Sequence, residues 1–302
     1  MTTRVSLWGL LFVLITGGAA ASEREPRPKN WSVELGAMIG HHSNVHSRPN
    51  DNGAAVPTAT MTLLYLNGEL SKRWFTTYFD TSGTTYAGDE SVSDQITGLL
   101  GVKFSPKNTR VAVEYGEMPS TEYAEEETDS YFDVESLRLK LRQGKSRKVW
   151  IGARYALERW TFDPLEADRD ADVRKASATL RVPLGQRFGM RASYLLEAKD
   201  AQDQQYSWSG DGTSLAIEAR PTSRILAFVR YRFRTRTYDD APDTSSYFGR
   251  QDDLEDVSLN LRVQVGRHWG LRFQDIYRRV ASNLPDRDYD AIQANAGVFV
   301  TF

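Results

Sequence analysis

The chain has 302 residues, a formal net charge of −2 at pH 7 and no cysteine. Charged residues make up 26% of it, and after residue 21 no run approaches the roughly 20 apolar residues that a membrane-spanning helix needs. This composition excludes an α-helical membrane protein, a disulfide framework and an anchor attached through cysteine. A membrane-spanning β-barrel remains possible, because only alternate residues of its strands face lipid while the others face a polar lumen.

The first thirty residues predict export across a membrane. Arg4 precedes the apolar stretch Val5 to Thr16, which is too short to span a bilayer and is typical of a secretory signal. Small residues follow, and Ala19-x-Ala21 fits a signal-peptidase site; an uncleaved N-terminal anchor is the alternative. We therefore expect a cleaved signal peptide over residues 1–21, a periplasmic lead-in over 22–30 and a single barrel domain over 31–302.

From Trp31 onward, apolar and polar residues alternate with a period of two. Such alternation predicts strands with one polar and one apolar side. In the second segment the apolar side comprises Ala59, Met61, Leu63 and Tyr65, which we expect to face lipid. About 14 strands are predicted, with 12 or 16 as alternatives, over residues 31–39, 58–66, 73–81, 95–104, 110–116, 131–142, 148–160, 174–182, 188–197, 213–220, 224–237, 257–265, 269–280 and 289–302.

Short turns and longer polar loops alternate between these segments. In a membrane barrel the short turns belong to the periplasmic side and the long loops to the outside, whereas a soluble sheet protein has no reason to sort its connections by length. Acidic residues are concentrated in two predicted outer loops, 117–130 and 238–256. The predicted fold class is all-β, a transmembrane antiparallel up-and-down β-barrel.

The last eight residues carry a more specific pattern. Asn295, Gly297, Val300 and the terminal aromatic Phe302 resemble the C-terminal insertion signal of bacterial outer-membrane β-barrels. The resemblance implies the outer membrane of a Gram-negative bacterium, with the barrel-assembly machinery, outer-membrane lipid and lipopolysaccharide as partners. A soluble sheet whose last strand happens to end the chain is the alternative.

The first strand offers a second resemblance, over about ten residues. The segment from Gly36 to Val45 ends in His41-His42-Ser43-Asn44-Val45. It looks like the first-strand ending of some large outer-membrane barrels that are associated with exopolysaccharide export, and of porin-like barrels. His42 stands where those barrels usually have an acidic residue, so this chain departs from the pattern there. The resemblance implies passage of a polysaccharide.

Basic residues dominate the predicted lumen-facing side. In the segment 224–237, Arg230, Arg232, Arg234 and Arg236 occupy every second position, opposite an apolar set. The same rule places further cations inside: Arg138, Lys140, Arg154, Arg181, Arg191, Arg262 and Arg272. Fewer acidic residues fall on the inner side, namely Glu34, Glu114, Glu158, Glu197 and Glu218. A wall of guanidinium groups concentrates anions.

These patterns predict an outer-membrane channel for anionic solutes, acidic saccharides among them. The alternatives are the barrel of a polysaccharide-export system, a hydrolase at the rim, and a structural barrel closed by its own salt bridges. We expect no enzyme activity, no catalytic residue, no cofactor and no nucleic-acid partner. His41, His42 and His46 form a candidate metal site in the first outer loop, although histidines in a loop are more often incidental.

Overall fold

The computed structural model describes residues 31–43, 59–72, 74–87, 95–106, 109–123, 129–144, 148–162, 164–238, 241–243, 245, 247–284 and 287–302. The chain divides into two units, Met1–Asn30 and Trp31–Phe302. The predicted signal peptide and lead-in lie outside the described residues. The second unit contains all the strands described below.

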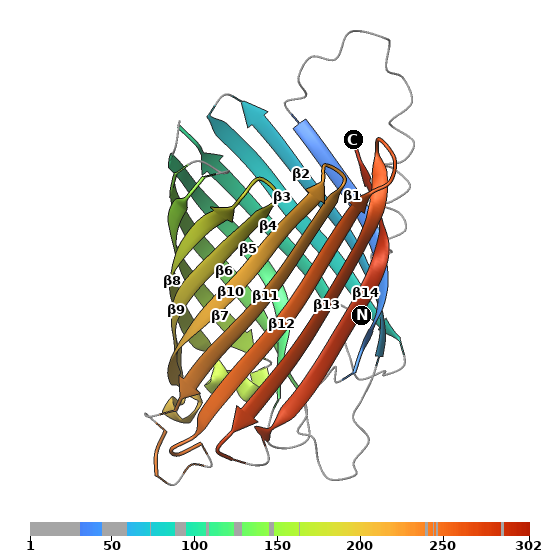
Figure 1. Ribbon diagram of the computed structural model, residues 1–302. Coiled ribbons are helices and arrows are strands. Elements are labelled where there is room, and N and C mark those ends of the chain that lie inside the picture. Colours follow the sequence, from blue (N-terminus) through green and yellow to red (C-terminus); the bar gives the residue numbers. More distant parts are fainter. Residues whose placement is uncertain are drawn as a thin grey trace. The chain divides into compact units, whose positions relative to one another are not determined.

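Fourteen strands form one closed antiparallel barrel (Figure 1). Each strand pairs with its neighbours in sequence, and β1 pairs with β14 to close the ring, so the predicted fold class and the predicted number of strands are confirmed. The strands are β1 (Trp31–His42), β2 (Ala59–Lys72), β3 (Phe75–Ala87), β4 (Gln95–Phe104), β5 (Thr109–Tyr123), β6 (Asp129–Gly144), β7 (Trp150–Phe162), β8 (Ala171–Leu184), β9 (Phe188–Ala201), β10 (Trp208–Thr222), β11 (Ile225–Thr237), β12 (Gln251–Gln264), β13 (Trp269–Ser282) and β14 (Tyr289–Thr301).

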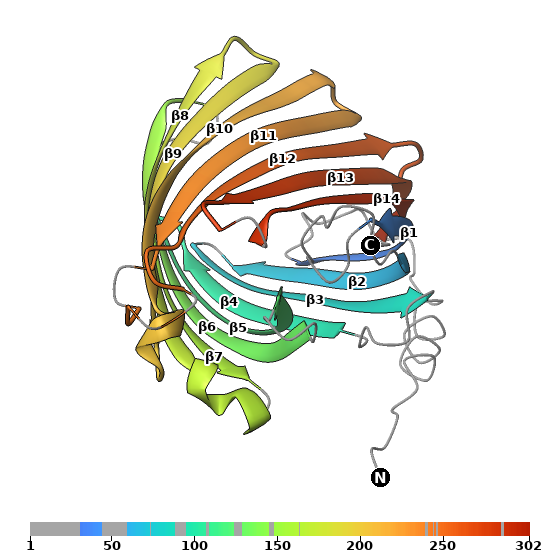
Figure 2. The same cartoon turned by 90° about the horizontal axis from the view of Figure 1, so that it is seen from below.

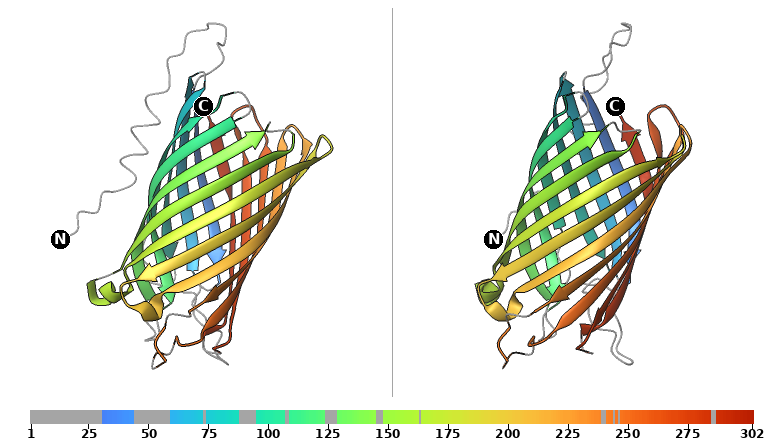
Figure 3. Two further views of the ribbon diagram at one scale, coloured as in Figure 1. Left: turned by 90° about the vertical axis from the view of Figure 1, so that its left-hand side faces the viewer. Right: turned by 60° about the vertical axis from the view of Figure 1, so that its left-hand side comes forward.

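The two ends of the barrel differ. The side views in Figure 3 show the C-terminus and the short turns at one end. Two short 3₁₀ helices, η1 (Pro164–Arg169) and η2 (Gln204–Tyr206), lie in the connections at the other end. No helix within the described ranges is long and apolar enough to cross a membrane. Figure 2 looks at the ring of strands from the end that carries these helices.

The outer side of the barrel is apolar in the middle and has aromatic residues towards both ends. Near the long loops, three exposed tyrosine hydroxyls donate hydrogen bonds to outward-facing carboxylates, from Tyr115 to Glu117, from Tyr194 to Asp211 and from Tyr277 to Asp290. Near the short turns, large exposed side chains include Trp31, Trp74, Phe75, Phe188 and Trp269. An apolar band between two aromatic girdles is the outer surface of a membrane-spanning barrel.

The predicted face of the second strand was wrong. Met61 and Tyr65 are buried on the lumen side, where Tyr65 packs with Met38, Phe299 and Leu63, while exposed Leu70 lies on the outer side. The reason is a close approach: the ring of Tyr65 lies over its cross-strand partner Gly36, where an added Cβ would be 2.2 Å from the ring. An apolar set can therefore face the lumen where it covers a glycine.

The two predicted acidic loops are shorter than expected. β5 and β6 pair as far as Tyr123 and Asp129, through most of the predicted loop 117–130. β12 begins at Gln251, within the predicted loop 238–256. The extension of β12 changes the account of the lumen, because it adds two buried carboxylates, Asp252 and Asp256, to the inner wall.

Candidate functional site: the lumen wall

The predicted basic residues lie on the lumen side of their strands. On β11, for example, exposed Val229 and Tyr231 face outward and alternate with Arg230 and Arg232. The same alternation with exposed outward residues places Arg138, Lys140, Arg154, Arg181, Arg191, Arg262 and Arg272 inside. The sequence therefore predicts that these side chains point into the lumen. Their ion pairs, however, separate those that are bound to a carboxylate from those that are not.

Asp256 of β12 is the centre of one ion-pair network. Its side chain is only 1% exposed. Arg232 Nε and Arg278 Nε each donate to its carboxylate at 2.8 Å, and Arg234 Nη2 donates at 3.3 Å. One carboxylate is thus shared by three guanidinium groups from β11 and β13, which holds these strands together through the inner wall.

Glu197 of β9 is the centre of a second network. Arg236 Nε donates to Glu197 Oε1 at 3.0 Å, and Arg234 Nη1 lies 3.6 Å from the same oxygen. Both arginines reach over β10 from β11, because Gly210 and Gly212 stand opposite them. A Cβ at Gly212 would lie 2.5 Å from Arg234 Cγ, so only glycine leaves room for this crossing.

Glu218 of β10 is the centre of a third network, with nitrogens of Arg181, Arg191 and Arg220 at 3.6, 3.4 and 3.0 Å. In total, three carboxylates contact seven arginines, so these ten side chains together carry a formal charge of +4. The seven are Arg181, Arg191, Arg220, Arg232, Arg234, Arg236 and Arg278. This part of the wall is cross-linked and still positive.

The four predicted ladder arginines of β11 are therefore not equivalent. Arg232, Arg234 and Arg236 are tied to carboxylates. Arg230 has no carboxylate within 4.0 Å among the described residues, and its Nε is buried without a hydrogen-bond partner. Their proposed part in anion selectivity stays a prediction, and for three of them a structural contribution is already visible.

Sequence reasoning missed Asp252 and Asp256, which were assigned to a loop. Both are buried on the inner side of β12. A signal was available in the sequence. Val257, Leu259 and Leu261 place the odd-numbered positions of this strand outside, so the even-numbered positions 256, 254 and 252 face inward. The density of charge in Gln251–Asp256 hid that alternation.

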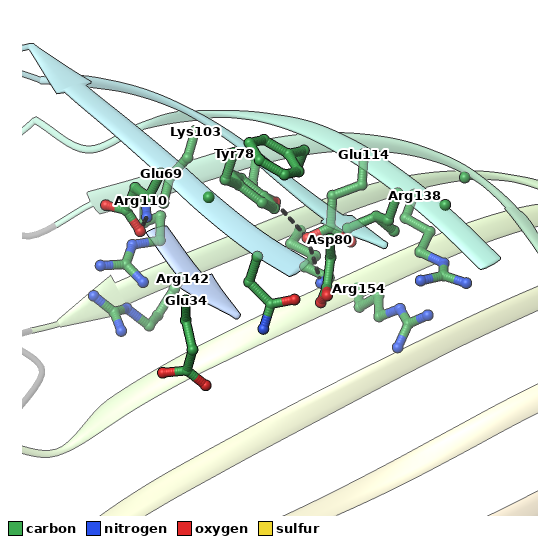
Figure 4. A pocket seen from close by; sticks show the side chains of 18 of the residues that line it. Glu34, Glu69, Tyr78, Asp80, Lys103, Arg110, Glu114, Arg138, Arg142 and Arg154 are labelled. Carbon is green, nitrogen blue, oxygen red and sulfur yellow. Dashed lines mark hydrogen bonds and ion pairs between the residues drawn. The ribbon is translucent and has the colours of Figure 1, made fainter. Parts of the chain in front are cut away.

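A cavity of about 1080 Å³ occupies the half of the lumen near the short turns (Figure 4). Its acidic lining includes Glu34, which pairs with Arg262 at 2.5 Å, and Glu114, which accepts from Lys140 at 2.5 Å and also from the Tyr78 hydroxyl. Its cations come mainly from β5, β6 and β7: Arg110, Arg138, Lys140, Arg142 and Arg154. The lumen is thus hollow here and rich in arginine.

A cluster of mostly aromatic side chains lies at the other end of the barrel. Inner residues of β6, β7, β8 and β10 pack with residues of the β11–β12 connection, in a cluster of Phe132, Val134, Trp160, Phe162, Val173, Trp208, Tyr238, Ala241 and Tyr247. Guanidinium groups stack on it, Arg250 on Tyr247 at 5.0 Å and Arg169 on Tyr206 at 5.0 Å. Burial raises the pKa of Tyr206 in η2 to about 12.

The proposed metal site gains no support from the geometry. His41 is exposed on the outer side of β1, whereas His42 lies on the inner side, and His46 lies outside the described residues. No group of three or more His, Cys, Asp or Glu side chains that could hold a metal ion occurs in the described ranges. The expectation that the chain is not an enzyme stays a prediction.

The C-terminal residues occupy the positions that the alternation predicts. Val300 and exposed Phe302 face outward, while Gly297 and buried Asn295 face inward. β14 is held on both edges, by β13 and by β1, and the backbone N–H of Phe302 donates to the carbonyl of Val33 at 2.9 Å. Their part in assembly remains a prediction.

No protein-family model and no curated protein matches the chain. Solved structures that resemble it include OmpT, an outer membrane protein of Vibrio cholerae (TM-score 0.49, 8% identity, 93% of this chain and 100% of that chain). Others are the outer membrane channel DcaP of Acinetobacter baumannii (0.47, 10%, 93% and 100%) and an anion-selective porin from Comamonas acidovorans (0.46, 8%, 90% and 98%). Likenesses this distant assign no function to the chain.

Proposed function

We propose that this chain is a bacterial outer-membrane channel that favours anionic solutes, acidic saccharides among them. The observation that carries the proposal is the excess of arginine over carboxylate on the lumen wall. Asp256, Glu197 and Glu218 are each surrounded by two or three guanidinium groups. Arg230 adds a further charge, with no carboxylate within 4.0 Å in the described part of the chain. A low-dielectric wall of this kind attracts anions and repels cations.

Export of an acidic polysaccharide is the second candidate. The specific observation in its favour is the position of the cavity, at the short-turn end. In a membrane barrel that end faces the periplasm, where cargo for export would enter. The same basic wall would serve passive uptake and export, so the two candidates differ in partners and direction.

Single-channel recording in planar bilayers under a salt gradient tests the proposal. The purified mature protein should form a stable pore whose reversal potential shows a preference for anions. Arg230→Ser should reduce that preference and Arg230→Lys should retain it, because lysine keeps the charge. A silent protein, a cation-selective pore, or no difference between the two variants would contradict the proposal.

A further inference from the structure

The strand register places like charges directly opposite each other on β5, β6 and β7. Arg110 faces Arg142, and Lys140 faces Arg154. Like charges in directly opposed positions destabilise a sheet. Among the described strands two other basic pairs are directly opposed, Arg181 with Arg191 and Arg262 with Arg272, and so are two acidic pairs, Glu117 with Glu135 and Asp172 with Asp200. The basic pairs line the lumen, so the question is how each of them is compensated.

Elsewhere on the wall the repulsion is relieved by nearby groups. Arg181 and Arg191 share Glu218. Arg262 pairs with Glu34 at 2.5 Å, and Arg272 lies over the ring of Tyr65 at 5.2 Å. In these two basic pairs each arginine therefore has a partner, either a carboxylate or an aromatic ring.

On β5, β6 and β7 compensation is incomplete. Glu114 takes Lys140, but Arg110, Arg138 and Arg154 have no carboxylate within 4.0 Å among the described residues. The Nε groups of Arg110 and Arg138 are buried without a hydrogen-bond partner. Sequences that break a local rule without compensation in the fold do so mainly at functional sites.

Together with Arg142, these three arginines form two groups within one cavity. Arg110 and Arg142, the turn-side pair, are cross-strand partners near the short turns. Arg138 and Arg154, the mid-lumen pair, are diagonal neighbours that repel each other. Figure 4 shows the two pairs on either side of Glu114. Arg138 and Arg142 are four residues apart on β6, which is about 13 Å along a strand.

We propose that the turn-side pair and the mid-lumen pair form a two-part binding site for an acidic oligosaccharide that carries carboxylates at intervals along its length. Guanidinium groups bind carboxylates through two parallel hydrogen bonds, and a separation of about 13 Å suits an extended solute better than a compact anion. The site rests on the proposed function and names its ligand class.

The rest of the cavity favours a sugar over a densely charged polymer. Neutral polar side chains from the neighbouring strands line it as well, among them Asn67, Ser82, Thr97 and Thr179, and can exchange hydrogen bonds with sugar hydroxyls. Carboxylates line it as well, including Asp80 and Glu114. A solute with a charge on every unit at short spacing, such as polyphosphate, would meet these carboxylates, whereas an oligosaccharide can place hydroxyls there.

Equilibrium binding to the full mature protein in detergent tests the site. The probes are oligogalacturonates from monomer to hexamer, with inorganic phosphate and linear polyphosphate for comparison. Affinity should rise at least tenfold with chain length until both pairs are engaged, and Arg110→Gln or Arg154→Gln should each remove that gain. Arg159→Gln, which changes an exposed outward arginine of β7, should leave it unchanged.

Folding does not confound the test. Arg110 and Arg154 contact no carboxylate of the residues that the structure describes, so their glutamine variants leave none of these acids unpaired and should unfold at the same temperature as the wild type or higher. Equal affinity for all chain lengths, unchanged binding in both variants, or preference for polyphosphate would overturn the site. An anion-selective pore without length-dependent binding refutes the site alone, whereas a silent bilayer with intact length-dependent binding refutes the channel alone.

Discussion

Asp256→Asn is the most direct perturbation of the inner wall. The carboxylate is 1% exposed and accepts from Arg232, Arg234 and Arg278. Within the described ranges, Arg234 alone of the three has a second carboxylate, Glu197. The asparagine keeps the shape but removes the charge, which leaves Arg232 and Arg278 without a carboxylate from that part of the chain. Breaking a buried ion pair by neutralising one partner costs about 3–5 kcal/mol, and we expect a loss of that size in the free energy of unfolding.

Urea unfolding of the barrel in lipid vesicles, followed by tryptophan fluorescence, measures this loss. Asp253→Asn is the matched control, since Asp253 lies on the outward side of the same strand and accepts one hydrogen bond, from Thr235 at 3.1 Å. The control should change stability by less than about 1 kcal/mol. If both variants unfold at the same urea concentration, the shared carboxylate does not hold the wall together and the reasoning fails.

Three further predictions address other parts of the barrel. Gly212→Val should displace Arg234 and cost about 1–3 kcal/mol through overpacking, measured by the same unfolding assay, whereas Gly98→Val should cost little because a Cβ at Gly98 meets no atom within 4 Å. Deletion of Phe302 should lower the yield of heat-modifiable barrel in the outer membrane; a normal yield would contradict its assignment as an assembly signal. Tyr206 should ionise near pH 12, seen as the absorbance change at high pH that Tyr206→Phe removes, and ionisation near the ordinary tyrosine pKa would show that it is not buried.

The fold was predictable because membrane barrels repeat a simple rule. The alternation of apolar and polar residues, together with the lengths of the turns, predicted the number of strands, because every strand has one side that faces lipid. The rule fails where an inner side chain is apolar. Tyr65 was placed outside because sequence alone does not show that its partner across the strand is Gly36, and the partner depends on register.

The lumen arginines were predictable in direction but not in pairing. Each lies where alternation puts it, yet Arg236 meets Glu197 two strands away, 39 residues back in the sequence. That contact depends on Gly210 and Gly212 between them. Asp256 lies in a run of charged residues, which is typical of an exposed loop. Its ion pairs with the β11 arginines were therefore not predicted from the sequence.

The arginines of the inner wall thus fall into two groups. From β8 to β13, shared carboxylates bind most guanidinium groups, and glycines leave room for arginine side chains to extend across a neighbouring strand. On β5 to β7, the register opposes like charges, and within the described residues Arg110, Arg138 and Arg154 have no carboxylate within 4.0 Å. Packing gains nothing from that arrangement, because replacing Arg154 with a neutral residue would remove a repulsion. A side chain that weakens the fold and faces the hollow part of the lumen is best explained by what it binds there.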